Sequence, residues 1–436
     1  MAATSILNDL GSRIAEAGRS LAMWSGTRDD GLPALCDSLL SGKGEAVGLA
    51  VAVAALERYA ALDSEGREAF FIDAVHRFGP DAEAMARAAE RWRAEGHGAA
   101  RALHYAAQPR SLELIRRLNR APGGTRALVR MREDLIALLP KRPELRPLDD
   151  DFHHLFASWF NRGFLELRSI DWDTPAAILE KIIAYEAVHE IQGWGDLRRR
   201  VAAPDRRLYA FFHPALKDDP LIFVEVALTA EIPAAIGPIL AESREPLDPA
   251  KASTAVFYSI SNCQKGLKGV SFGSFLIKQV AEELRREFSG LRCFVTLSPV
   301  PGLAAWARDE AQGEDGALGP KQAEAVAALD APAPDPEALD AAETALAEIA
   351  ALYLCEGRDR RGGAADPVAR FHLGNGARLE RINPGADAGA RARRASWGLM
   401  VNYRYDLDDI ERNHETYAQT GAVIASSAVR RLARRR

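Results

Sequence analysis

A serine and a histidine in the second half of this sequence have the types and surroundings needed for proton transfer. Ser298 follows the strand-like run 292–297 and precedes Pro299. Proline cannot continue a strand ladder, so the Ser298 hydroxyl is expected to project where a strand ends. His372 lies between an apolar flank and the turn Leu-Gly-Asn-Gly. Such residues can act as proton carriers or as a nucleophile and its base. A capping serine and a structural histidine are the alternatives.

A basic glycine turn is the third place where chemistry is possible. Its residues are Lys268, Gly269, Val270, Ser271, Phe272, Gly273 and Ser274. A strand-like run precedes it and an apolar helical pattern follows it, so several backbone N–H groups lack intrahelical partners there. Such a turn is suited to a phosphate group. The local pattern alone also fits a turn that binds nothing.

The elements that must position these residues form a mixed pattern. Residues 254–260 read as a strand because they are dense in β-branched and aromatic side chains. A helix is expected after the turn, since Phe272, Phe275, Leu276, Val280 and Leu284 recur at helical spacing. Other strands are expected at 208–212, 221–228 and 292–297, and a helical stretch at 174–189. Residues 309–340 are read as low-order helix and loop.

The first 165 residues differ in character from the rest. They are rich in Ala, Leu, Arg and Glu, with apolar positions three and four apart in 49–62 and 112–139. This pattern predicts a helical bundle. A chain of 436 residues is too long for one ordinary core. We therefore expect an α+β protein: an all-α domain at 1–165 and an α/β domain at 166–436.

Composition excludes several classes of protein. Hydrophobic residues make up 47%, charged residues 27%, and the net charge is −5. This balance is normal for a globular protein and argues against a general nucleic-acid binder. No run is apolar enough to cross a membrane or to act as a secretion signal. Four scattered cysteines suit a reducing cytoplasm and give no zinc pattern. Glu186 and His189 lack a second Glu-x-x-His partner, so no metal site is predicted.

Several segments of the second half resemble the malonyl-CoA decarboxylase family. They occur in the family's order and span most of residues 165–436. The segments are Tyr258–Val280, Thr296–Gly302, Pro367–Asn383 and Ser396–Leu407, with a weaker fifth match at Glu186–His189. Pro384 stands where the family usually has an aromatic residue, and 388–394 is unusually basic.

The resemblance implies a fold and a set of site residues. The catalytic half of the family is similar in fold to GNAT acyltransferases, which hold the pyrophosphate of CoA on a turn of the form Gln/Arg-x-x-Gly-x-Gly/Ala. Residues 268–274 stand in that place, with Lys268 first and Ser271 instead of a pattern glycine. The resemblance makes Ser298 and His372 the catalytic residues. It implies that further side chains line the site, namely Asn375, Asn402, Tyr403 and Tyr405.

The implied reaction converts malonyl-CoA to acetyl-CoA and CO2. No metal or organic cofactor is chemically required, because the thioester carbonyl accepts the electrons of the breaking bond. His372 is the expected proton donor and Ser298 its partner, with an unperturbed histidine pKa of about 6.5 suiting proton transfer. The alternatives are attack by Ser298, acyl transfer to an amine, and a CoA sensor without turnover. The family also implies a homo-oligomer, a dimer or tetramer, formed through the helical half.

Overall fold

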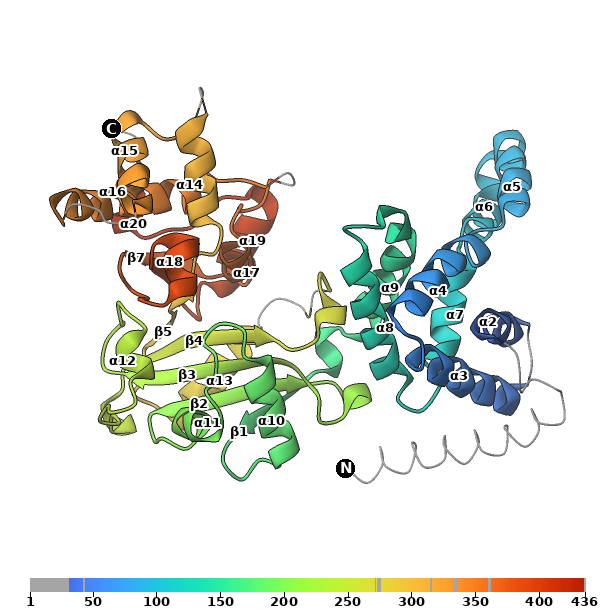
Figure 1. Cartoon of the computed structure of the whole chain (residues 1–436), viewed down its shortest axis with the longest axis horizontal. Coiled ribbons are helices and arrows are strands. Elements are labelled where there is room, and N and C mark those ends of the chain that lie inside the picture. The colour runs from blue at the N-terminus through green and yellow to red at the C-terminus, as the bar shows by residue number, and fades with distance from the viewer. Residues whose placement is uncertain are drawn as a thin grey trace. The chain divides into compact units, whose positions relative to one another are not determined.

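The computed structural model describes residues 31–41, 44–270, 272, 276–313, 316–331, 336–359 and 362–434. The chain divides into two compact units (Figure 1). The first contains residues 1–166, 212–221 and 263–272, and the second contains 167–211, 222–262 and 273–436.

The first unit is helical, as the sequence predicts. Its apolar side chains recur at helical spacing; in α7, for example, Leu112, Ile115 and Leu118 are buried while Arg116 is not. Helix α8 packs against α4 and α9, and α7 packs against α2 and α3. The helices are α2 (Leu32–Leu40), α3 (Glu45–Ala60), α4 (Ser64–Arg77), α5 (Ala82–Glu95), α6 (Ala100–Ala106), α7 (Arg110–Leu118), α8 (Gly124–Leu138) and α9 (Arg146–Trp159).

Two later segments belong to this helical unit. Residues 212–221 contain the short helix η4 (Pro214–Leu216), and residues 263–272 contain η6 (Lys265–Leu267). Both η4 and η6 contact α8. The helical unit is therefore not one contiguous stretch of chain, and it includes the first part of the basic glycine turn.

The second unit is built on a mixed sheet. Among the described residues the sheet has eight strands in the order β1-β2-β3-β4-β5-β8-β6, with β7 paired to β8. All four strands expected from the sequence are present. The strands are β1 (Glu166–Ile170), β2 (Arg206–Phe212), β3 (Pro220–Thr229), β4 (Thr254–Asn262), β5 (Cys293–Thr296), β6 (Ser298–Pro299), β7 (Arg378–Asn383) and β8 (Met400–Tyr405).

Strands β4 and β5 separate part-way along their length. They pair in parallel only from Thr254↔Cys293 to Phe257↔Thr296, and Leu297 N–H then donates to Phe257 O at 3.0 Å. Next, β6 pairs with β8 through Ser298↔Val401. On its other side β4 has a register shift, since Val226 pairs with Phe257 and Glu225 with Ser259. Ser298 therefore lies where the chain leaves β4 and joins β8.

Helices complete the second unit. The stretch expected at 174–189 forms α10 (Ala176–Tyr185), which stops short of Glu186. The helix expected after the turn is α13 (Leu276–Glu287), with Leu276, Val280 and Leu284 buried; Phe275 lies outside the described residues. The others are α11 (Trp194–Val201), α12 (Gly237–Leu240), α14 (Leu303–Gln312), α15 (Pro320–Asp330), α16 (Pro336–Glu356), α17 (Pro367–Gly374), α18 (Ala390–Ser396), α19 (Ile410–Thr420) and α20 (Ser427–Ala433).

The stretch 309–340 is more regular than the sequence reading expected. It contains α15 and the start of α16, which pack against each other and, with α14 and α20, form a helical group (Figure 1). Ala325 and Val326 are buried in α15. The many alanines explain the difference, because alanine favours helix without large apolar groups. Among the described residues, no helix is both long and apolar enough to cross a bilayer.

Candidate functional site

Helix α17 holds His372 inside the second unit. Asp366 caps this helix, and its carboxylate accepts hydrogen bonds from the N–H groups of Val368 and Ala369, both at 2.9 Å. Pro367 occupies the first helical position, where its fixed φ fits and its missing N–H costs nothing. His372 lies one and a half turns further on and is only 2% exposed.

Ser298 contacts His372 directly. The Ser298 Oγ lies 3.1 Å from His372 Nε2 and is itself buried. It also donates to Thr296 Oγ1 at 2.8 Å. On the other side of the imidazole, Nδ1 lies 2.8 Å from the hydroxyl of Tyr405 in β8. The structure thus brings together three of the residues singled out in the sequence.

The directions of these bonds assign the tautomer of His372. The Ser298 hydroxyl hydrogen is used toward Thr296, so Ser298 Oγ accepts from Nε2–H. Nδ1 then carries no hydrogen and accepts from the Tyr405 hydroxyl. A neutral imidazole with its proton on Nε2, facing Ser298, is the consequence.

Aromatic rings and burial keep this imidazole neutral. Tyr403 stacks on the His372 ring with centroids 4.7 Å apart, and Phe257 meets Tyr405 edge to face. Burial lowers the pKa of His372 to about 3, because the charged form would lose its hydration. The unperturbed value of about 6.5 expected from the sequence is therefore wrong for this structure.

Thr296 is a residue of the site that sequence reasoning missed. Its Oγ1 accepts from Ser298 and from the backbone N–H of Tyr403 at 3.1 Å. It therefore ties the serine to β8. Thr296 lies two positions before Ser298 in the same motif, and this strand-like spacing was the available signal.

The other predicted lining residues play different parts. Asn402 donates to the carbonyls of Thr296 and Pro233 and accepts from Arg381 and Asn383, so both ends of its amide are occupied. These hydrogen bonds connect β8 to β5 and β7. Asn375 caps the C-terminal end of α17 and donates to Phe371 O at 2.7 Å.

Comparison with known proteins identifies the relatives of this chain. A model of the malonyl-CoA decarboxylase C-terminal domain matches residues 163–436, and a model of the N-terminal domain matches residues 78–160. The chain belongs to the malonyl-CoA decarboxylase family. The resemblance stated from the motifs is thereby confirmed.

Relatives in this family are similar over most of their length. The mitochondrial malonyl-CoA decarboxylase of Anser anser anser is 36% identical over 75% of this chain and 70% of its own, and that of Rattus norvegicus is 35% identical over 75% and 72%. Two crystal structures of malonyl-CoA decarboxylases are each 53% identical. The one from Rhodopseudomonas palustris covers 92% of this chain and 98% of its own with a TM-score of 0.89. The one from Agrobacterium vitis covers 93% and 100% with a TM-score of 0.86.

The structure describes the first part of the basic glycine turn, residues 268–270, and Phe272. Lys268 and Gly269 are exposed, and Val270 is buried. Within the described part of the chain, Lys268 forms no ion pair, so its ammonium group is not neutralised there. Phe272 is half-buried. Ser271, Gly273 and Ser274 lie outside the described residues.

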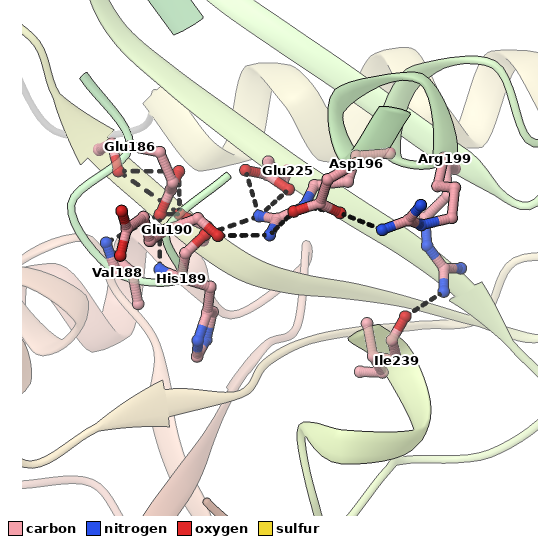
Figure 2. A network of polar contacts seen from close by, with 12 residues as sticks. Glu186, Val188, His189, Glu190, Asp196, Arg199, Glu225 and Ile239 are labelled. Carbon is pink, nitrogen blue, oxygen red and sulfur yellow. Dashed lines mark hydrogen bonds and ion pairs between the residues drawn. The ribbon is translucent and has the colours of Figure 1, made fainter. Parts of the chain in front are cut away.

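A second polar cluster surrounds the fifth, weaker motif (Figure 2). The Glu186 carboxylate accepts from the hydroxyls of Ser259 and Ser261 and from the backbone N–H groups of Val188 and His189. It therefore closes the loop after α10 onto β4, beside the register shift.

An arginine extends this cluster into the core. Arg200 bonds the carboxylates of Glu225 and Asp196 at 3.3 and 3.0 Å. Burial raises the pKa of Glu225 to about 8, although Arg200 opposes this shift. These contacts stabilise the loop and the strand.

The described residues contain no group of three or more His, Cys, Asp or Glu side chains that could hold a metal ion. None of the four cysteines forms a disulfide; Cys36 and Cys263 are buried, while Cys293 and Cys355 are half-buried.

Proposed function

We propose that this protein decarboxylates malonyl-CoA to acetyl-CoA and CO2. The contact between Ser298 Oγ and His372 Nε2 carries the proposal, because it joins two family motifs that lie 74 residues apart. The pair is buried. A substrate carboxylate bound beside it loses its hydration, which favours its departure as neutral CO2. Membership of the family supports the same reaction.

The proposed reaction has two steps. The bond between the α-carbon and the carboxylate breaks, CO2 leaves, and the electron pair moves onto the thioester as an enolate. A proton then adds to the α-carbon, giving the acetyl thioester. The enzyme must therefore stabilise a developing oxyanion and supply one proton.

His372 and Ser298 suit these two tasks. A neutral imidazole can donate its N–H to an enolate, and here Nε2 carries the hydrogen. The negative charge of the bound substrate raises the pKa of His372, so that the imidazole can take up a proton from solvent. The imidazolium then gives this proton to the α-carbon and returns to the neutral form. Ser298 is the proposed relay or carboxylate partner. Attack by Ser298 is disfavoured because His372 Nε2 would have to accept the serine proton, and it already carries one.

We also propose that the turn beginning at Lys268 binds the pyrophosphate of CoA. The exposed ammonium of Lys268 and the glycine at 269 support this assignment, since phosphate needs charge and close approach of backbone N–H groups. Because the motif continues beyond Gly269, we propose that the same site also includes Val270, Ser271, Phe272, Gly273 and Ser274.

Two properties of the whole protein complete the proposal. The first is a homo-oligomer, a dimer or tetramer, formed through the helical unit. Exposed Met85, Trp92 and Tyr105 on α5 and α6 support it, because large apolar side chains at a surface favour association. The second is a cytoplasmic location, which four cysteines without a disulfide favour.

The test uses mass spectrometry of the products formed from malonyl-CoA. We expect acetyl-CoA and CO2, and we expect His372→Ala and Ser298→Ala each to lower kcat by about 10²–10⁴-fold. The exposed His76→Ala and Ser158→Ala are matched controls and should leave kcat unchanged. Free malonate would indicate serine hydrolysis, and an acylated amine would indicate acyl transfer. Tight CoA binding without turnover would indicate a sensor. Each of these results contradicts the proposed reaction, and wild-type kcat in both variants contradicts the assigned roles.

A further inference from the structure

The helical unit contains a buried arginine that the proposed chemistry does not use. Arg132 of α8 is 2% exposed. Its Nε donates to Asp149 Oδ1 at 2.8 Å. Its Nη1 donates to two backbone carbonyls of the basic glycine turn, Gly266 O at 2.9 Å and Lys268 O at 3.1 Å. One guanidinium therefore joins the helical core to the turn.

The turn is seated closely on this helix. A Cβ atom at Gly266 would lie 1.8 Å from Val129 O, so only glycine permits the approach. His153 of α9 adds a contact, with its Nε2 3.1 Å from Gly269 O. The short helix η6 and α8 are in contact along this seam. The position of the turn is thus set by the helical unit.

Arg132 also fixes which way a peptide group points. In a trans peptide the C=O and the following N–H point in opposite directions. Because Lys268 O faces Arg132, the N–H of Gly269 faces away from α8. This N–H makes no hydrogen bond with another described residue, and Gly269 has a φ of +82°, which favours glycine. An outward N–H beside an exposed lysine ammonium is what a phosphate oxygen requires.

We propose that Arg132 is a positioning residue for the phosphate groups of the substrate. It holds the Lys268 carbonyl inward, so that the Gly269 N–H is presented outward before the ligand arrives. The helical unit then contributes to substrate binding as well as to the proposed association of subunits. This inference rests on the proposed binding of CoA by the turn.

The experiment compares malonyl-CoA with malonyl-pantetheine, which has the same thioester but lacks the pyrophosphate. In the full-length protein, Arg132→Lys keeps a positive charge beside Asp149 but cannot span the same three acceptors. We expect KM for malonyl-CoA to rise about 10-fold or more, the loss expected for a charge-assisted hydrogen bond. The kcat and the constants for malonyl-pantetheine should stay within about two-fold, since the reacting groups are untouched.

Two variants serve as controls. Asp149→Asn removes the same ion pair but leaves an acceptor for Arg132, so KM for malonyl-CoA should stay near wild type. Lys268→Ala tests the turn itself and should raise KM for malonyl-CoA alone. If Arg132→Lys does not fold, Gly266→Ala provides the second route, because its methyl group displaces the turn from α8.

The outcomes separate the two proposals. A selective effect of Arg132→Lys, or of Gly266→Ala, supports the inference. Equal losses on both substrates, or equal effects of Arg132→Lys and Asp149→Asn, mean a merely structural role and overturn it. If Lys268→Ala is selective and Arg132→Lys is not, only the inference about Arg132 fails. If neither is selective, the proposed binding of CoA by the turn fails with it.

Discussion

At the scale of single residues, the direction of one hydrogen bond separates the possible uses of a serine and histidine pair. In a hydrolase the imidazole accepts the serine proton. Here the Ser298 hydroxyl donates its hydrogen bond to Thr296 Oγ1 instead, and His372 Nε2–H donates to Ser298 Oγ. The two residue types are visible in the sequence, but the direction depends on Thr296 and on Tyr405, which approaches Nδ1 from β8.

Tyr405→Phe tests this assignment. The ring and its packing remain, but Nδ1 loses its donor, and the proton can then move from Nε2 to Nδ1. We expect kcat to fall about 10-fold, in line with the loss of about one buried hydrogen bond, with little change in KM. The measurement is steady-state kinetics together with ¹⁵N chemical shifts of the His372 ring.

The control for this change is Tyr417→Phe, which also removes one hydroxyl contact, to the Ala364 N–H. It should leave kcat and the imidazole shifts unchanged. An unaltered tautomer and kcat in Tyr405→Phe would show that the tyrosine does not orient His372.

At the scale of the elements, the position of His372 depends on how α17 begins. Asp366 accepts from two N–H groups of the helix and from Gly302 N–H at 3.3 Å, at the start of α14. One carboxylate therefore fixes α17 relative to the segment that follows Ser298. An Asp-Pro pair before an apolar run is a helix-start signal, so this residue was open to prediction.

Asp366→Ala is expected to weaken both stability and turnover. Loss of an N-cap costs about 1–2 kcal/mol in the free energy of unfolding, and a displaced α17 lowers kcat. Asp366→Asn keeps an acceptor oxygen and should retain most of both. Urea unfolding and kcat of the two variants check the prediction, which is wrong if Ala and Asn behave alike.

The elements also mark the limit of what the sequence could predict. The strands at 206–212, 220–229, 254–262 and 293–296 follow from local composition. The two-residue β6 does not, because it exists only by pairing with Val401 and Met400, about a hundred residues later. The sequence reading underestimates the helical order of α15, because this segment has few large apolar residues. Its many alanines do favour a helix.

At the scale of the whole molecule, sequence order and spatial grouping differ. The basic glycine turn follows β4 directly, yet residues 263–272 group with the helical unit. The contact responsible, Arg132 to Gly266, spans 134 residues. No local pattern marks such a contact, and Arg132 reads in sequence as one of many arginines on a helix. The motif predicts a phosphate site, whereas the contacts that hold the turn against α8 are visible only in the fold.

A buried neutral histidine also affects the stability of the whole chain. His372 has a folded pKa of about 3 and an unfolded value of about 6.5. Between these pH values the unfolded chain binds a proton that the native chain excludes. Stability is therefore unaffected by this group above pH 6.5 and falls as the pH drops toward 3, by about 1.4 kcal/mol per unit.

His372→Asn isolates this contribution, because asparagine does not titrate. We expect the wild type to lose about 2 kcal/mol more than the variant in the free energy of unfolding between pH 7 and pH 5. Urea unfolding at pH 7, 6 and 5 measures the difference, and other titrating groups cancel because both proteins contain them. A difference that does not change with pH would mean that His372 takes up its proton in the native state. The pKa of His372 in the native protein would then lie near 6.5, and burial would not be what keeps the imidazole neutral.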